Sequence, residues 1–138
     1  MISAPFPPPD LAVLEDMADA ARAVIPDNLR RHLDGVVIHV ADFPDEATCR
    51  VMDLESPFDL LGLYHGVALG DKSVSATPTN VDMIFLYRRP ILDYWAETGE
   101  DLHHIVRHVL IHEVGHHFGF SDADMERIER QAADRAKG

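Results

Sequence analysis

Apolar residues recur at helical spacing near both ends of the chain. Between residues 11 and 25 they occupy one side of a helical wheel and Pro26 follows, so a helix is expected over residues 11–24. A second helix is expected over residues 101–118, with an apolar side made of Val109, Leu110, Ile111, Val114 and Phe118. A third is expected from Ser121 to Lys137, with a narrow apolar stripe and a Ser121-x-x-Asp124 pattern that resembles a capping box.

Three short apolar runs predict strands, at residues 36–40, 60–67 and 81–87. The first is β-branched and is expected to be buried, and the last is apolar enough to lie at the centre of a sheet. Gly62 and Gly66 interrupt the middle strand, which indicates either a packing bulge or the close approach of another backbone, such as a bound peptide.

Two shorter helices are expected between these strands and after them. One begins at Pro44 and ends near Leu54, and the other begins at Arg88 and is closed by Gly99, while residues 70–80 form a polar loop. A length of 138 residues suits one domain with a sizeable core, so we expect residues 1–138 to form a single domain.

Charge and composition narrow the choice of partners. Acidic residues outnumber basic ones by 24 to 12, and the resulting net charge of −12 argues against nucleic acid or an anionic membrane as a partner. No apolar run approaches the ~18 residues of a membrane span, and residues 1–10 lack the regions of a secretory signal. Cys49 is the single cysteine, which excludes an intrachain disulfide and favours a reducing compartment. We therefore expect a cytoplasmic protein; its oligomeric state is not indicated.

The candidate chemistry lies in an H-E-x-x-H motif at residues 112–116. Residues four apart share one face of a helix, so His112 and His116 can hold one zinc ion through their imidazoles. Glu113 is adjacent to them on the wheel, where its carboxylate can reach a water molecule at the metal and take its proton. The motif therefore predicts one zinc ion per chain.

The third zinc ligand is expected to be Asp122. Gly119 occupies the position of a left-handed helix cap, after which the chain can turn back and bring Asp122 toward the metal. Two histidines and one carboxylate leave a fourth position for water, as in catalytic zinc sites. Glu126 or Glu129 of the next helix can instead supply this ligand, so the choice stays open.

Other histidines surround the motif. His104 and His108 precede His112 by eight and four residues, along the same flank of the helix, and we expect them to be solvated or hydrogen-bonded. His117 points about 100° away from His116 and is not expected to share its metal.

These motifs resemble those of the minimal zincins, a family of small bacterial zincin-like metallopeptidases. The resemblance rests on residues 106–122 and is supported by residues 61–66 and 84–88. It implies an α+β fold in which a small mixed sheet of about three to four strands packs against helices, with the H-E-x-x-H motif on a central helix. It also implies zinc bound by His112, His116 and Asp122, with Glu113 as the general base. Metzincins differ in placing a third His where Asp122 stands.

We therefore expect a zinc-dependent metallopeptidase that acts on a peptide or protein substrate. Zinc would polarise the peptide carbonyl, and Glu113 would pass a proton from the attacking water to the leaving amine. Tyr64, His65 and Arg88 are candidates for donating a hydrogen bond to the oxyanion.

Two other functions remain open. Bacterial endoribonucleases that mature ribosomal RNA use three histidines at the spacing of positions 112, 116 and 122, but here Asp122 replaces the last and Glu113 has no counterpart. A non-catalytic zinc- or peptide-binding module is the second alternative. The presence of Glu113 argues against that module, since a structural zinc needs no general base.

Overall fold

The computed structural model describes residues 8–66 and 81–138, which form helices around one small sheet. The α-helices are α1 (Leu11–Val24), α2 (Asp27–Arg30), α3 (Glu46–Val51), α4 (Arg88–Thr98), α5 (Leu102–His117) and α6 (Asp122–Lys137). The strands are β1 (Val37–Ala41), β2 (Gly62–His65) and β3 (Met83–Tyr87), and two 3-10 turns are η1 (Arg31–Leu33) and η2 (Pro57–Asp59). The predicted α+β class is confirmed.

The sheet is mixed and has β3 at its centre. The strand order is β1-β3-β2, with β1 parallel to β3 and β2 antiparallel to it. The central position predicted for residues 81–87 is therefore confirmed. Because β2 is an edge strand, the backbone groups on its outer side are not used by the sheet.

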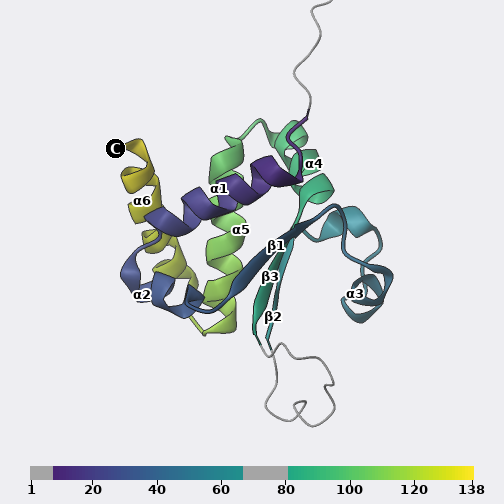
Figure 1. The fold of residues 1–138 in the computed structure, drawn as a ribbon, viewed down its shortest axis with the longest axis horizontal. Coiled ribbons are helices and arrows are strands. Elements are labelled where there is room, and N and C mark those ends of the chain that lie inside the picture. The colour runs from purple at the N-terminus through teal and green to yellow at the C-terminus, as the bar shows by residue number, and fades with distance from the viewer. Residues whose placement is uncertain (1–7, 67–80) are drawn as a thin grey trace, which may run out of the picture.

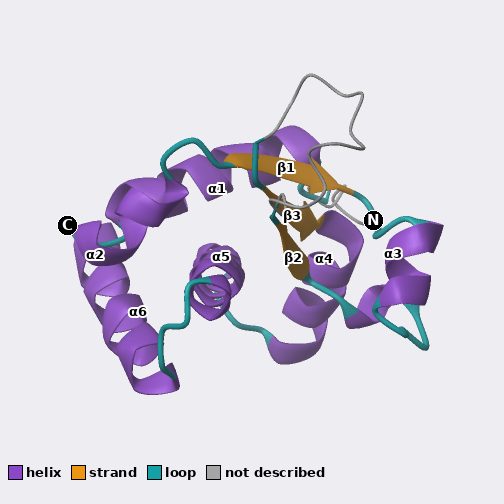
Figure 2. Ribbon diagram, turned by 90° about the horizontal axis from the view of Figure 1, so that it is seen from below, coloured by secondary structure: helices purple, strands orange, loops and turns teal. Residues whose placement is uncertain are grey.

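Helix α5 lies at the centre of the molecule. Figure 1 shows α1 crossing it and α6 beside it, and Figure 2 views it nearly end-on among α6, α1, the sheet and α4. Five of its apolar residues are at most 2% exposed, namely Ile105, Val106, Leu110, Ile111 and Val114. They join buried residues of α1, β3, α4 and α6 in one core, which leaves only one side of α5 for polar groups.

A tight turn joins α5 to α6. Gly119 has a φ of 80°, the left-handed conformation predicted for it. The N–H groups of Gly119 and Phe120 donate to the carbonyls of His116 (3.2 Å) and Gly115 (2.8 Å), which is a Schellman motif. Ser121 then opens α6 with the predicted capping box. The end of α5 and the start of α6 are thus both capped by local hydrogen bonds.

Some sequence predictions are wrong in detail. β1 is not a buried strand: Val40 is 3% exposed but Val37 is 46% exposed, because β1 lies at an edge and buries only alternate residues. Phe118 is not in the core either. It follows the last residue of α5, is 40% exposed and stacks on His32, with ring centroids 4.3 Å apart.

Other predictions differ in extent or cannot be compared. The short helical turns α2 and η1 follow Pro26, where the pattern predicts only the end of a helix. The predicted loop at 70–80 lies outside the described residues. No helix in the described part of the chain combines the length and apolar character needed to cross a bilayer. The single domain over residues 1–138 stays a prediction.

Gly62 marks a close approach of β2 to α5, and its substitution tests this packing. A Cβ there would lie 2.5 Å from Val109 Cγ1 and 3.0 Å from the carbonyl oxygen of Phe85. We expect Gly62→Ala to lower the free energy of unfolding by about 1–3 kcal/mol, measured by urea denaturation. Val109→Ala removes the nearer clash, so the double variant should lose less than the sum of the single losses. Strictly additive losses would contradict the contact.

Candidate metal centre and active site

Four histidines form a row along the polar side of α5. His104, His108, His112 and His116 are spaced by four residues and therefore share one face of the helix. The ring centroids of His108 and His112 are 4.0 Å apart, and those of His112 and His116 are 5.6 Å apart. The His112 side chain is 24% exposed and that of His116 is 60% exposed. The row is thus open to solvent, with His112 more enclosed than His116.

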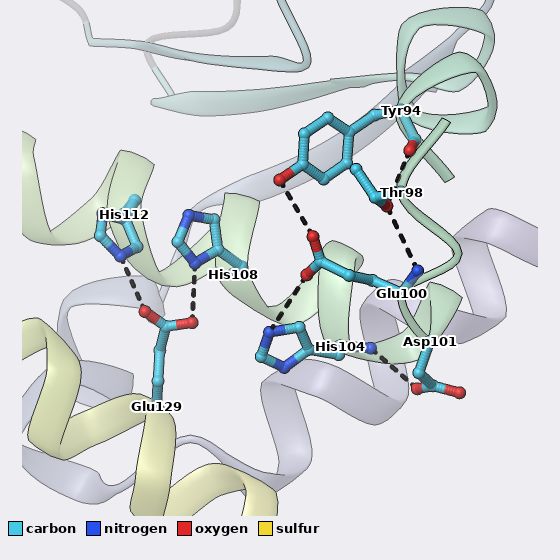
Figure 3. A network of polar contacts seen from close by, with 8 residues as sticks. All are labelled: Tyr94, Thr98, Glu100, Asp101, His104, His108, His112 and Glu129. Carbon is cyan, nitrogen blue, oxygen red and sulfur yellow. Dashed lines mark hydrogen bonds and ion pairs between the residues drawn. The ribbon is translucent and has the colours of Figure 1, made fainter. Parts of the chain in front are cut away.

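Glu129 of α6 contacts two members of this row. Its carboxylate oxygens lie 2.8 Å from His108 Nδ1 and 2.8 Å from His112 Nε2 (Figure 3). Burial alone would raise the pKa of Glu129, but the hydrogen bonds from His108 and His112 outweigh it and lower the pKa. The hydrogen bond to Glu129 in turn raises the pKa of His108. One ionised carboxylate is therefore shared by two imidazoles.

The packing of α6 explains why Glu129 reaches the row. Met125, Ile128 and Ala132 are buried and turn one side of α6 toward the core. Glu129 follows Ile128 directly and lies at the border of this stripe, with a side chain that is 16% exposed. Its position on α6 therefore directs the carboxylate along the α5 interface and onto the imidazoles.

Glu113 points toward β2. Its Oε1 accepts a hydrogen bond of 3.0 Å from the backbone N–H of Tyr64, whose ring stacks on His117 with centroids 3.8 Å apart. Burial raises the pKa of the Glu113 carboxyl, and this is partly offset by the Tyr64 hydrogen bond and by the charges of His116 and His112. A carboxyl with a raised pKa beside two metal-ligand candidates is well suited to accept a proton at neutral pH.

Asp122 lies near His116. Its Oδ1 is 4.0 Å from His116 Nε2, and its side chain, on the first residue of α6, is 90% exposed. Among the described residues, the potential ligand atoms that all lie within 4.8 Å of one another belong to a different set, His108, His112 and Glu129. The predicted set of His112, His116 and Asp122 is not gathered this closely.

The donor types of these side chains fit zinc. Imidazole nitrogen and carboxylate oxygen are its usual ligands besides thiolate. Here His112 Nε2 faces Glu129 Oε2, so a metal ion bound to this nitrogen would take the place of the proton that the two groups share. The exposed side chains of His116 and Asp122 are free to turn toward such an ion.

Comparison with known protein families shows the family to which the chain belongs. Residues 33–132 match the family model described as zincin-like metallopeptidase, a stretch that contains β2, β3 and the whole of α5. The chain belongs to this family. The resemblance to minimal zincins is thereby confirmed at the family level, and the family suggests a zinc peptidase. No curated protein matches its sequence.

Two of the three candidate oxyanion donors of this zincin-like chain are engaged in other contacts. The hydroxyl of Tyr64 donates to Asp82 at 2.6 Å, and burial together with this hydrogen bond raises the pKa of Tyr64. The Arg88 guanidinium donates to Asp42 at 3.0 Å. His65 is exposed at the end of β2.

One polar network at the start of the histidine row is not predicted by the sequence analysis. The Tyr94 hydroxyl donates to Glu100 Oε2 at 3.1 Å, and His104 Nε2 lies 3.7 Å from Glu100 Oε1 (Figure 3). The spacing of four between Glu100 and His104 hints at the second contact. The first crosses the turn at Gly99, which ends α4 in the left-handed conformation with a φ of 70°.

The raised pKa of Glu113 predicts a pH-dependent gain in stability for Glu113→Gln in the metal-free protein. Below the ordinary value of 4.5 the carboxyl is protonated in both folded and unfolded chains, so variant and wild type should be alike. As pH rises through the raised folded pKa, ionisation destabilises only the wild type. Urea denaturation with a chelator should show the variant to be the more stable at about pH 7 but not at about pH 4.

The control is Glu126→Gln, which changes an exposed carboxylate on α6. It should show no such gain at either pH. Equal stability of Glu113→Gln and wild type at neutral pH would show that burial of Glu113 has no energetic cost.

Proposed function

We propose that the protein is a zinc-dependent metallopeptidase whose active site lies on the histidine row of α5. The observation that supports this most directly is the arrangement of Glu113. It lies beside the two motif histidines and is hydrogen-bonded to the edge strand β2, along which an extended peptide can lie. Membership of the zincin-like metallopeptidase family supports the same reaction class.

Zinc would be held by His112, His116 and a carboxylate of α6. The motif spacing assigns the carboxylate to Asp122, and the 4.0 Å separation of Asp122 Oδ1 from His116 Nε2 supports this. A specific contact favours a second arrangement, because Glu129 Oε2 is 2.8 Å from His112 Nε2. In the first arrangement Glu129 is a hydrogen-bonding partner that orients His112, and in the second it is the ligand itself.

Bound zinc and Glu113 would have separate roles in hydrolysis. When bound, zinc supplies a Lewis acid that lowers the pKa of water to about 7 and polarises the scissile carbonyl. Glu113 takes the proton from the attacking water and delivers it to the nitrogen of the leaving amine. Its Oε1 is held by the Tyr64 N–H, whereas Oε2 accepts no hydrogen bond within the described part of the chain and can face the water.

The open edge of β2 provides a place for the substrate backbone. Because Tyr64 directs its N–H away from β3, its carbonyl faces the same way, and the strand is accessible from Tyr64 to His65, whereas Gly62 is buried against α5. An extended peptide paired with this edge would pass beside Glu113. The hydrogen bond between Tyr64 and Glu113 brings this strand next to the motif, which supports pairing of a peptide with its edge.

The two alternative functions make different demands on the same residues. An endoribonuclease-like hydrolase needs an electropositive groove for the RNA backbone, whereas this chain carries a net charge of −12. A non-catalytic binding module gives Glu113 no chemical role. Peptide cleavage that depends on zinc and on Glu113 separates the peptidase from both alternatives.

Zinc analysis of single variants tests the ligand set. We expect about one zinc ion per wild-type chain, and loss of most of it in His112→Ala and His116→Ala. Asp122→Ala should weaken zinc binding more than Glu129→Ala does. The first removes a ligand, whereas the second removes a partner that orients His112, a loss that typically lowers metal affinity by about 10–100-fold. Glu126→Ala, on an exposed part of α6, serves as the control and should bind zinc normally. The reverse ranking of Asp122 and Glu129 would assign the third ligand to Glu129.

Substitution of Glu113 separates catalysis from metal binding. Glu113→Gln retains the acceptor for the Tyr64 N–H but removes the base, so zinc content should be unchanged. Cleavage of any peptide that the wild type hydrolyses should fall by about 10²–10⁴-fold. A peptide library screened with the wild type supplies the substrate, and initial rates at equal zinc content give the comparison. Equal rates for the two proteins would falsify the role of Glu113 as the base.

A further inference from the structure

A pocket adjoins the histidine row one turn before the motif. It has a volume of about 260 Å³ and lies between α5, the end of α4 and the residue that precedes β2. Its apolar wall is formed by Leu61, Ile105 and Val109. Pockets for whole drug-sized ligands usually measure about 300–1,000 Å³, so this one suits a single side chain.

The pocket borders the proposed active site at His108. His108 forms part of its wall, and the ring of His108 lies 4.0 Å from that of His112. On its other side, Leu61 leads directly into β2, where the N–H of Tyr64 binds Glu113. A peptide extended along the edge of β2 would therefore pass the pocket, and one of its side chains could enter.

The polar end of the pocket is formed by Glu100. The Tyr94 hydroxyl donates to its Oε2 at 3.1 Å, and His104 Nε2 lies 3.7 Å from its Oε1 (Figure 3). The backbone N–H of Glu100 donates to Thr98 Oγ1 at 3.2 Å, which fixes the start of the side chain. A carboxylate offers about four acceptor positions, so these contacts leave Glu100 able to accept further hydrogen bonds.

Charge selects the kind of side chain that fits. Among the described residues, no lysine or arginine lines the pocket, and the imidazole of His108 that faces it is paired with the carboxylate of Glu129. A neutral apolar side chain could fill the wall but would cover part of the Glu100 carboxylate and offer it no donor. A long side chain with an apolar stem and a cationic end satisfies both parts of the pocket.

We propose that this pocket selects substrates with a basic side chain, preferably arginine, whose guanidinium binds Glu100. The inference rests on the proposed peptidase function, since the side chain is carried by a peptide lying along β2. The planar guanidinium can donate two parallel hydrogen bonds to one carboxylate, which favours arginine over lysine. Glu100 is thus a specificity-determining residue that does not take part in the chemistry.

The test compares capped pentapeptides that have arginine, citrulline or leucine in the centre and alanine elsewhere. Citrulline has nearly the shape of arginine but no charge. Binding to zinc-loaded Glu113→Gln protein is followed by NMR through the methyl groups of Leu61, Ile105 and Val109. The arginine peptide should shift these methyl signals and bind on the order of tenfold more tightly than the other two, as expected for a charge-assisted hydrogen bond.

Matched variants assign the preference to the pocket. Adding Glu100→Gln should abolish the difference between arginine and citrulline, whereas Glu97→Gln, an exposed position on α4 outside the pocket, should preserve it. Equal binding of the three peptides, absence of binding by the arginine peptide, or an arginine preference that survives Glu100→Gln would overturn the proposal.

Cleavage by the wild type, measured in parallel, separates this proposal from the peptidase function. Arginine-dependent binding without cleavage would support the pocket and contradict the peptidase. Cleavage of all three peptides with equal kcat/KM would support the peptidase and contradict the pocket.

Discussion

The burial of one side of α5 is the constraint on which the rest of the structure depends. Its apolar residues face α1, the sheet and α6, and they cannot be rotated toward solvent without opening the core. Residues four apart share a face, so the orientation of α5 that buries its apolar residues also places all four histidines on the opposite side. Packing therefore determines where the candidate ligands point before any metal is bound.

The two middle residues of the motif take part in this packing. Val114 is fully buried, and Gly115 lets α6 approach so closely that a Cβ there would lie 2.5 Å from Met125 Sδ. This close contact of α5 and α6 brings Glu129 to His108 and His112. The geometry of the candidate metal centre is thus linked to helix packing within the motif itself.

Most of the fold can be predicted from local patterns, because each of the longer helices α1, α4, α5 and α6 has a recognisable start, stop or apolar stripe. Gly119 and Ser121 are examples in which a single residue type predicts the observed turn and cap. The edge position of β1 could not be predicted from local patterns, because it depends on pairing with β3, which lies far along the chain. The contact of Glu113 with Tyr64 could not be read from local patterns for the same reason. The motif identifies His112, Glu113 and His116 as candidates, whereas the choice between Asp122 and Glu129 depends on how α6 packs.

The sequence separation of these contacts has a consequence for how the protein folds. Glu129 meets His112 across 17 residues within one helical hairpin, whereas Glu113 meets Tyr64 across 49 residues. Short loops close at a lower entropic cost than long ones, so the hairpin of α5 and α6 can form before β2 docks. For the proposed peptidase, the candidate metal ligands on α5 and α6 would then come together before Glu113 is positioned by β2. Metal uptake and catalytic competence would arise as two successive events.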